Sequence, residues 1–569
     1  MITKMKTQEF NPVNDETWRK VTVESLRGLP FEKLLTKTLE GIEIQPLYTK
    51  EQVDKELGAR QEELLEAIRA GKTSGDWTVA QRTYTQDGTA FVEEVEDALA
   101  KGNEAIVYDG SFPVDWNESA LKALAKLATR YPLYAFHVGK EDPFVNLFKE
   151  IAPEERKQVR GVFTGEASVP EGFPLVRSAV ADTIDAHVQG ADAVTELAIA
   201  LAQASELATD YNSFTQFEHQ FAVRFAIDTH FFMEIAKLRS FRILWQTFAK
   251  AYGHEKESRV PIFSETSLRS FSKLDPYVNL LRAGNEAFSA VLGGTDVLTV
   301  HPHDVIGEVT EAGIRHARNI QLVIKAETFV DQVIDPAGGS YFIDTLTNEL
   351  TEKAWDLFLE IEDQGGYEAY VASGALKERL ANLYQARKEA LSRREASLIG
   401  TNIYANLEDR LPEGETLRVE NRLAETYEQL RASLAKEQPH TVLLTFGELK
   451  DFKARADFVE GFLATAGIKV EYSPAFTSVS EALAWIEKEN FDYGVICAHP
   501  KEIETVMEEL VQSFPKDRWI DVAGSYDEET EKAWRKAGVS GFIYQGQDQL
   551  EKFSSIIARW KGEGTHAEA

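Results

Sequence analysis

The sequence predicts an α/β protein in which a (β/α)8 TIM barrel is followed by a flavodoxin-like doubly wound domain. Eight short β-rich segments alternate with helical segments between residues 77 and 302. Five more strand-like segments alternate with helices after residue 440. A chain of 569 residues is also too long for one ordinary hydrophobic core. We expect an arm over 1–70, a barrel with trailing helices over 71–400, a linker over 401–438 and the second domain over 439–569.

The N-terminal arm contains an apolar patch but no second element that would cover it. The patch consists of Phe31, Leu34, Leu35 and Ile42. Because contiguous exposed apolar residues mark contact surfaces, we expect this patch to be buried against another domain or another chain.

The eight barrel strands are predicted by short runs rich in β-branched and aromatic residues. They lie at 77–84, 105–110, 132–138, 161–165, 174–182, 221–228, 260–266 and 297–302, with helices at 91–101, 118–129, 190–208, 232–251 and 277–291. The segment EASVPE between the fourth and fifth strands is too short for a helix, so this βα unit is incomplete. Further along, Pro336, Gly338 and Gly339 predict a turn, and Thr347 is expected to cap the helix that follows.

The last 130 residues predict a parallel sheet with strands near 441–447, 469–474, 493–498, 519–523 and 541–545. In a doubly wound sheet, the loop after the first strand usually holds a ligand. Here that loop, Gly447 to Arg455, contains no His, no Cys and no Gly-rich phosphate cradle. The domain therefore has the outline of a cofactor-binding domain without an evident binding motif.

The composition argues against several classes of partner. The 62 basic and 93 acidic residues give a formal net charge of −31, which repels nucleic acid and anionic membranes. The single cysteine, Cys497, lies in an apolar run and is expected to be a small buried hydrophobic residue. No secretory signal or membrane-spanning segment is predicted, so we expect a cytoplasmic protein.

One alternative function is a metal-dependent TIM-barrel hydrolase. Asp228 and His230 follow the sixth strand, while His301 and His303 follow the eighth. Two His and a carboxylate can bind Zn²⁺ with one position left for water. However, no spacing here is diagnostic of a metal site, and Asp228 is also an ordinary helix-capping residue.

Three stretches resemble the methylmalonyl-CoA mutases, which are adenosylcobalamin-dependent isomerases. They are residues 317–367, containing VIDPAGGSYFIDTLT, residues 233–245, MEIAKLRSFRILW, and residues 287–298, AFSAVLGGTDVL. The resemblance implies a barrel that takes the CoA ester along its axis. It also implies a C-terminal domain in which an Asp-x-His-x-x-Gly loop supplies the His that coordinates cobalt.

This chain departs from the family pattern at the positions that would carry the chemistry. Lys450, Phe452 and Arg455 stand where Asp, His and Gly belong, and the later groove positions fall on Ile496 with Ala498 and on Ala523 with Gly524. In the barrel, Ile184 and Asp185 replace Tyr-His, while Ala80, Gln81 and Arg82 replace Arg-Gln-Tyr. Phe263, Glu265 and Leu268 replace His, Gln and Gly. We expect Arg82, Phe225 and Phe263 to fill the barrel axis, and Asp185 and Glu265 to repel an anionic thioester.

The resemblance therefore implies the non-catalytic small subunit of a heterodimeric mutase. Its partner would be a catalytic large subunit of the same fold, which would hold the adenosylcobalamin and interconvert methylmalonyl-CoA and succinyl-CoA. We expect no catalytic residue, no cofactor and no metal on this chain. The second alternative is a regulatory protein that binds a CoA thioester without cobalamin.

Overall fold

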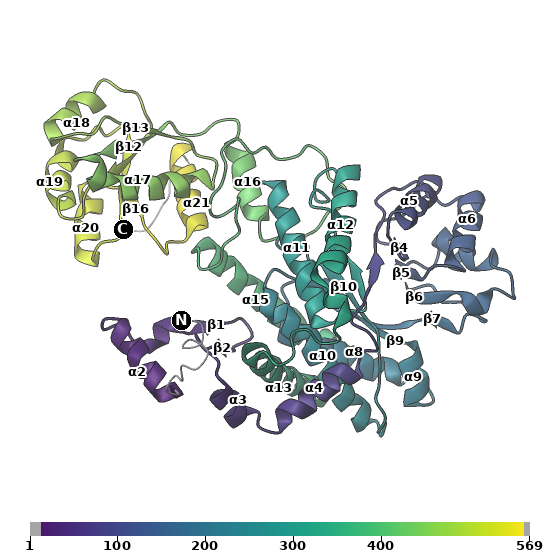
Figure 1. Cartoon of the computed structure of the whole chain (residues 1–569). Coiled ribbons are helices and arrows are strands. Elements are labelled where there is room, and N and C mark those ends of the chain that lie inside the picture. Colours follow the sequence, from purple (N-terminus) through teal and green to yellow (C-terminus); the bar gives the residue numbers. More distant parts are fainter. Residues whose placement is uncertain (1–12, 563–569) are drawn as a thin grey trace, which may run out of the picture. The chain divides into compact units, whose positions relative to one another are not determined.

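The computed structural model describes residues 13–562 and contains two compact units (Figure 1). The barrel unit runs to Ser267 and also includes Ala283–Pro302 and Glu311–Leu383. The C-terminal unit includes Leu268–Arg282, His303–Thr310 and the chain from Tyr384 onward. Each unit contains parallel β-sheet covered by helices, as the sequence predicts.

All eight predicted barrel strands are present. They are β3 (Thr78–Ala80), β4 (Ile106–Asp109), β5 (Leu133–Val138), β6 (Arg160–Gly165), β7 (Leu175–Arg177) with β8 (Ala179–Asp182), β9 (Phe221–Ile227), β10 (Ile262–Thr266) and β11 (Val297–Thr299). Hydrogen bonds join them into two parallel sheets, ordered β3-β11-β10-β9-β8 and β4-β5-β6-β7. The sheets meet at an isolated bridge between Arg82 and Val107, and at Ser178, where the fifth predicted strand divides into β7 and β8. The wall of the barrel is thereby closed.

Helices follow most strands at the predicted places. They are α5 (Gly88–Ala100), α6 (Glu118–Ala128), α7 (Ile184–Val188), α8 (Ala193–Ala208), α9 (Phe214–Gln220), α10 (Phe231–Ala251), α11 (Pro276–Gly293) and α12 (Glu311–Thr328). Asp87, Asn117 and Asp192 begin α5, α6 and α8 by accepting a hydrogen bond from a backbone amide of the first turn. No helix separates β6 from β7 in this described stretch, which confirms the incomplete fourth unit.

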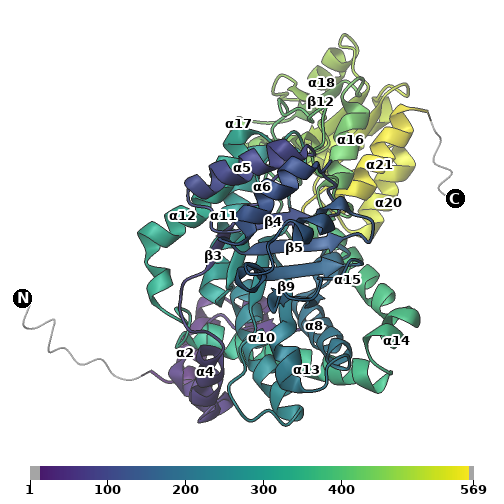
Figure 2. The same ribbon diagram turned by 90° about the vertical axis from the view of Figure 1, so that its right-hand side faces the viewer.

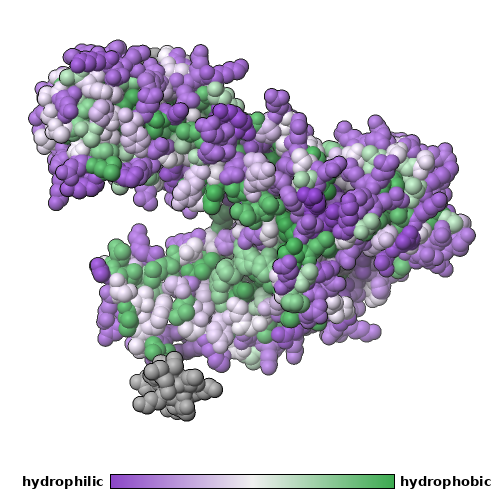
Figure 3. Space-filling model, turned by 45° about the horizontal axis from the view of Figure 1, so that its top comes forward, coloured by the Kyte–Doolittle hydropathy of each residue, from purple (hydrophilic) through white to green (hydrophobic). Residues whose placement is uncertain are grey.

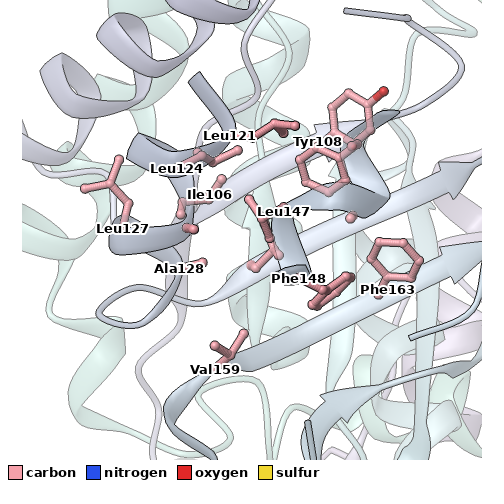
Figure 4. Close-up of a cluster of buried hydrophobic side chains, with 14 of the residues drawn as sticks. Ile106, Tyr108, Leu121, Leu124, Leu127, Ala128, Leu147, Phe148, Val159 and Phe163 are labelled. Atoms are coloured by element: carbon pink, nitrogen blue, oxygen red, sulfur yellow. The ribbon is translucent and has the colours of Figure 1, made fainter. Parts of the chain in front are cut away.

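One large core cluster fills the space between β4, β5, β6 and the helices that cover them (Figure 4). Ile106 and Tyr108 of β4 alternate with residues that face the barrel interior, and they meet Leu121 and Leu124 of α6. Figure 2 shows α5 and α6 lying side by side over this part of the sheet. The alternation of strand residues thus gives the barrel a separate outer core and inner core.

The N-terminal arm contains α2 (Asp15–Ser25), the short strands β1 (Thr36–Lys37) and β2 (Glu43–Ile44), α3 (Lys50–Glu56) and α4 (Arg60–Ala70). Of the predicted patch, Phe31 and Ile42 are buried, whereas Leu34 and Leu35 are half-buried. The ring of Phe31 packs edge-on against Trp18 of α2. The expectation that the arm cannot cover this patch itself is therefore wrong for Phe31.

A block of trailing helices follows the barrel, namely α13 (Tyr341–Asp363), α14 (Tyr367–Ala372) and α15 (Ala375–Ser392). The predicted turn before α13 is present, but Ser340 caps the helix by accepting a hydrogen bond from the Ile343 amide. Thr347 lies in the second turn and accepts a hydrogen bond from Arg239 instead. The prediction of Thr347 as the cap is wrong because the helix begins six residues earlier.

The C-terminal unit contains the five predicted strands, β12 (Thr441–Thr445), β13 (Val470–Tyr472), β14 (Tyr493–Cys497), β15 (Trp519–Ala523) and β16 (Gly541–Ile543). All pairs are parallel, and the order β13-β12-β14-β15-β16 is the flavodoxin-like order. The helices are α16 (Glu425–Leu434), α17 (Leu449–Ala464), α18 (Val479–Ile486), α19 (Ile503–Ser513), α20 (Glu528–Ala537) and α21 (Gln549–Trp560). Cys497 is fully buried, and burial raises the pKa of its thiol to about 12.

In the view of Figure 3 hydrophilic residues cover most of the outer surface, whereas apolar residues gather toward the middle of the face. Among the described residues, no helix combines the length and apolar character that crossing a bilayer requires.

Candidate functional site

The mouth of the barrel carries charged side chains of alternating sign. We call this set the charge belt; it consists of Arg82, Asp109, His137, Asp182, Arg224 and Glu265. Each comes from the carboxyl end or interior of a different strand, the region where sites form in this fold. These residues therefore occupy the place where a substrate would be expected.

Ion pairs link each member of the charge belt to the next, from Arg82 to Glu265. The Arg82 guanidinium lies 2.9 Å from Asp109, whose other oxygen lies 3.1 Å from Nδ1 of His137. Nε2 of His137 lies 3.6 Å from Asp182. Arg224 then bridges Asp182, at 2.8 Å, and Glu265, at 2.6 Å.

The backbone at His137 is adapted to this arrangement. His137 has a φ of 53°, in the left-handed region that side chains other than glycine rarely adopt. The pairing of β5 with β6 shifts register between Ala135 and Val138, so His137 lies at a bulge. A bulge re-aims a side chain, and here it turns the imidazole toward two carboxylates.

The belt's electrostatics keep its members charged. Hydrogen bonds to Asp109 and Asp182 raise the pKa of His137 to about 10. Burial alone would raise the pKa of Asp109, but Arg82, His137 and Arg224 together lower it far below its usual range. The pKa of Glu265 is lowered in the same way, because Arg224 and His301 outweigh its burial. At neutral pH the belt therefore holds three positive and three negative charges.

The barrel interior leaves little space beneath the belt. A cavity lined by Arg82, Arg224, Phe263, Glu265 and neighbouring residues has room for about one water molecule. Nη2 of Arg82 is buried and has no hydrogen-bond partner among the described residues, so it is a natural donor to such a water. This cavity is far too small for a CoA thioester, which is the ligand of the regulatory-protein alternative.

Of the residues predicted to lie on the barrel axis, some face the axis and one does not. Arg82 and Phe263 face the axis as predicted, and Glu265 belongs to the charge belt. Phe225 was predicted to fill the axis, but its ring packs on Phe241 of α10, outside the barrel. Strand alternation puts its neighbour Arg224 inside instead.

The substituted Tyr-His pair lies on α7 and not on a strand. Ile184 is half-buried, and Asp185 is exposed. Asp185 therefore does not face the axis, and the carboxylate that contacts the inward-facing Arg224 is Asp182, at the end of β8. The prediction assigned Asp185 this role because the family pattern places the Tyr-His pair on the fifth strand, whereas here β8 ends at Asp182.

The four residues of the metal-site alternative do not form a site. Among residues 13–562, no group of three or more His, Cys, Asp and Glu side chains is placed to hold a metal ion. His230 is exposed, while Asp228 accepts a hydrogen bond from the Thr229 amide. Nδ1 of His301 lies 2.8 Å from the hydroxyl of Tyr84.

In the C-terminal unit, the expected loop after β12 is mostly helix. α17 begins at Leu449, where Asp451 accepts a hydrogen bond from the Glu448 amide. Lys450, Phe452 and Arg455 thus lie on its first two turns. The prediction of a loop from Gly447 to Arg455 is wrong because it overlooked this capping arrangement.

These three side chains have distinct surroundings. Lys450 is exposed beside Glu448, and the ring of Phe452 is buried in the apolar core of the unit. The Arg455 guanidinium donates to the carbonyl of Ala523 and, at 2.9 Å, to the hydroxyl of Tyr526.

The carboxyl edge of β15 is closed by the same side chains. A Cβ at Gly524 would lie 3.0 Å from the Tyr526 hydroxyl and 3.2 Å from Arg455. Ile496, Ala498 and Ala523 are fully buried nearby in the sheet. The residues present do not suit a corrin, because a benzyl ring has no lone pair for cobalt and a guanidinium lies across the strand ends.

The three motifs that resemble the mutases meet around α10. Arg239 is almost fully buried and contacts Asp335 at 3.0 and 3.2 Å, Asp344 at 2.8 Å and Thr347 at 2.9 Å. The second motif thereby joins the turn and helix of the first. The Asp residues of VIDPAGGSYFID are thus structural, a role that sequence patterns alone do not reveal.

Arg242, one turn later, joins α10 to the third motif. It donates to the carbonyls of Gly71, Val260 and Gly294 and, at 2.6 Å, to Asp296. These bonds hold the start of β11 against the helix. The contacts of these motifs thus hold the framework of the barrel together.

The comparison with known proteins agrees with this framework. A family model described as methylmalonyl-CoA mutase matches residues 169–477, which is 309 of the 569 residues. The chain belongs to the methylmalonyl-CoA mutase family. This family comprises adenosylcobalamin-dependent isomerases, as the resemblance of the motifs implied.

Several relatives in this family align over most of their length. The methylmalonyl-CoA mutase small subunit of Porphyromonas gingivalis is 29% identical over 550 residues, 87% of this chain and 89% of the relative. That of Streptomyces virginiae is 28% identical over 614 residues, 97% of each chain. The methylmalonyl-CoA mutase of Cereibacter sphaeroides is 31% identical over 458 residues, 68% of this chain and 64% of the relative.

Proposed function

We propose that this chain is the non-catalytic small subunit of a heterodimeric methylmalonyl-CoA mutase. Its partner is a catalytic large subunit of the same fold, which binds adenosylcobalamin and isomerises methylmalonyl-CoA and succinyl-CoA. One observation supports the proposal: ion-paired side chains fill the mouth of the barrel, and Arg455 is hydrogen-bonded to the carboxyl end of β15 in the C-terminal unit. The near full-length similarity to proteins named small subunits supports it.

The charge belt opposes substrate binding energetically. A CoA thioester on the axis would have to separate ion pairs such as Arg224 with Asp182 and Glu265. Separating one buried pair costs roughly 3–5 kcal/mol, and the ligand would also bring negative charge toward carboxylates. The cations that line the cavity, Arg82 and Arg224, are already paired with carboxylates.

The C-terminal unit lacks a cobalt ligand at the position of Phe452. Its groove is closed by the hydrogen bonds of Arg455, so we assign no cofactor-binding residue to this chain. The degenerate positions that would distinguish this chain from a catalytic subunit are Lys450, Phe452, Arg455, Ile184, Asp185 and Arg82. We further propose that the cofactor resides on the partner only and that the isolated chain is inactive.

The arm is a natural contributor to the interface with the partner. α2 has no buried residue of its own, and Val13, Val21 and Leu29 are more than half exposed. We propose that the arm packs on the large subunit, in an interface above roughly 2,000 Å², the size of an obligate complex. We also propose that the chain divides into domains over 1–70, 71–400, 401–438 and 439–569. The proposed compartment is the cytoplasm.

The decisive experiment measures how many cobalamin molecules each heterodimer binds. The chain is co-expressed with the large subunit, purified, and titrated with adenosylcobalamin under equilibrium dialysis. We expect a one-to-one complex that binds one cobalamin per heterodimer, and an isolated small chain that stays colourless and shows no turnover. As a control, the complex is prepared with the cobalt-coordinating His of the large subunit replaced by Ala. Two cobalamins per heterodimer, or turnover by the isolated chain, would refute the proposal.

A further inference from the structure

A second polar cluster lies buried behind the mouth of the barrel, separate from the charge belt. We call it the buried chain; its members in order are Ser267, His187, Glu196, Lys237 and Glu234. The Ser267 hydroxyl lies 2.7 Å from Nε2 of His187, whose Nδ1 lies 2.7 Å from Glu196. Nζ of Lys237 lies 3.0 Å from the other oxygen of Glu196 and 2.6 Å from Glu234.

The buried chain connects elements that pack around three strands. Ser267 directly follows β10, His187 lies on α7 after β8, and Glu196 lies on α8. Lys237 and Glu234 belong to the first two turns of α10, and Lys237 also donates to the carbonyl of Ala226 on β9. The side chains of the four ionisable members are 0 to 6% exposed. Their contacts therefore fix how three helices sit on the barrel wall.

The charges within the buried chain do not balance without an extra proton. Lys237 supplies one positive charge, and Glu196 and Glu234 supply two negative charges when both are ionised; His187, beside Glu196, adds a second positive charge only when it is protonated. Asp228, at the end of β9, adds a further negative charge near Glu234. An uncompensated buried charge costs several kcal/mol, so one further proton within the buried chain, on a carboxyl or on His187, is favoured.

We propose that Glu234 holds this proton below neutral pH and releases it above neutral pH, making the buried chain a pH-sensitive lock between α10 and the barrel. Glu234 is the site because Lys237 also hydrogen-bonds Glu196, which His187 contacts as well. Burial raises the pKa of Glu234 to about 7, and the charges of Glu196 and Asp228 add to the rise against the effect of Lys237.

Lys237 remains the fixed cation of the lock. Burial lowers the pKa of Lys237, but Glu196 and Glu234 beside it raise it by more. When Glu234 loses its proton, two carboxylates compete for this one ammonium. We expect the N-terminal turns of α10 to loosen from α8 and β9, because the excess charge is relieved only by access to water.

The sign of the pH dependence follows from the raised pKa. A carboxyl whose pKa is higher in the folded state stabilises the fold fully below its unfolded value of about 4.5, and this contribution is lost as pH rises through about 7. Between about pH 4.5 and pH 7, each pH unit should therefore favour local opening of α10 by up to about tenfold, as for one proton released, and the opening should level off above pH 7. Replacing Glu234 by Gln keeps the shape of the protonated form and removes the titration.

The test uses the full chain with glutamate labelled by ¹³C. Infrared difference spectra between about pH 6 and pH 8.5 report the carbonyl stretch of a protonated carboxylic acid, and hydrogen exchange of the α10 peptide reports local opening. We expect one protonated band that disappears as pH rises through about 7, and opening of α10 in the wild type that rises with pH up to about 7 and then levels off. Both signals should vanish in E234Q and persist in E62Q, an exposed control on α4.

The outcomes decide the proposal in either direction. Wild-type spectra without a protonated glutamate at pH 6 would overturn it even if E234Q failed to fold. A band that persists unchanged in E234Q would show that another carboxyl titrates, which also overturns it. Opening of α10 that does not depend on pH would remove the lock while leaving the proposed subunit function unaffected.

Discussion

Replacing Arg239 by Met tests whether the shared motifs form a structural framework. The Arg239 side chain is 1% exposed and makes four hydrogen bonds, two to Asp335 and one each to Asp344 and Thr347. Asp335 and Asp344 are themselves only 1% and 3% exposed. In R239M, these two carboxylates would lose their shared cation without gaining access to water.

The expected loss can be estimated from this burial. Removing one partner of a buried ion pair destabilises a protein by roughly 3–5 kcal/mol. For a unit of this size, 1 kcal/mol corresponds to about 2 °C in Tm. We therefore expect the thermal unfolding transition of the barrel unit to fall by about 8 °C, as followed by the fluorescence of buried tryptophans such as Trp245.

Matched variants separate this mechanism from a general packing defect. The triple variant R239M/D335N/D344N leaves no buried charge unpaired and should recover most of the loss. R69M, on the exposed face of α4, should change stability by less than about 0.5 kcal/mol. A triple variant no more stable than R239M, or an R239M transition within about 2 °C of the wild type, would refute the reasoning.

Three further predictions follow from other parts of the structure. The ion pairs of His137 contribute to the stability of the fold fully below its unfolded pKa of about 6.5, and this contribution is lost as pH rises through about 10. A pH series of thermal unfolding should show this loss in the wild type and not in H137A. In G161A the new Cβ would lie 1.9 Å from the Leu133 carbonyl oxygen, at a residue whose φ is 145°. Tm should therefore fall by the equivalent of at least about 3 kcal/mol. The control G139A, which has open space at its Cβ, should leave Tm nearly unchanged. R455A should lose roughly 1–3 kcal/mol in urea unfolding of the C-terminal unit yet acquire no cobalamin absorbance, and a red-coloured R455A would contradict the assignment.

The sequence was sufficient for the order of elements because hydrophobic runs and turn residues are local signals. Each predicted strand of the barrel and of the C-terminal sheet is present. Whether a strand residue points into or out of the barrel was harder to predict from the sequence. In FAVRFAI of β9 every residue is buried, so apolar and polar residues do not alternate and Phe225 could not be distinguished from an inward residue.

The charge belt was not predicted, although its residues are visible as single charges in strand segments such as VYDG and AFHV. Asp109, His137 and Arg224 come from strands far apart in the chain, and their pairing depends on barrel register. A charged residue at the end of an apolar strand is the signal that could have found them. The interpretation of Phe452 and Arg455 as degenerate positions rests on the family resemblance, which indicates which residues to expect there.

The two seams of the barrel wall give the charge belt a mechanical consequence. Backbone pairing is sparse between β3 and β4, where one bridge remains, and at Ser178, where one strand passes between sheets. Two ion pairs, Arg82 with Asp109 and His137 with Asp182, link one half-shell of the wall to the other. Ion pairs thus supplement the backbone hydrogen bonds between the two half-shells, and because the Arg82–Asp109 pair is buried, added salt should weaken this link only slightly.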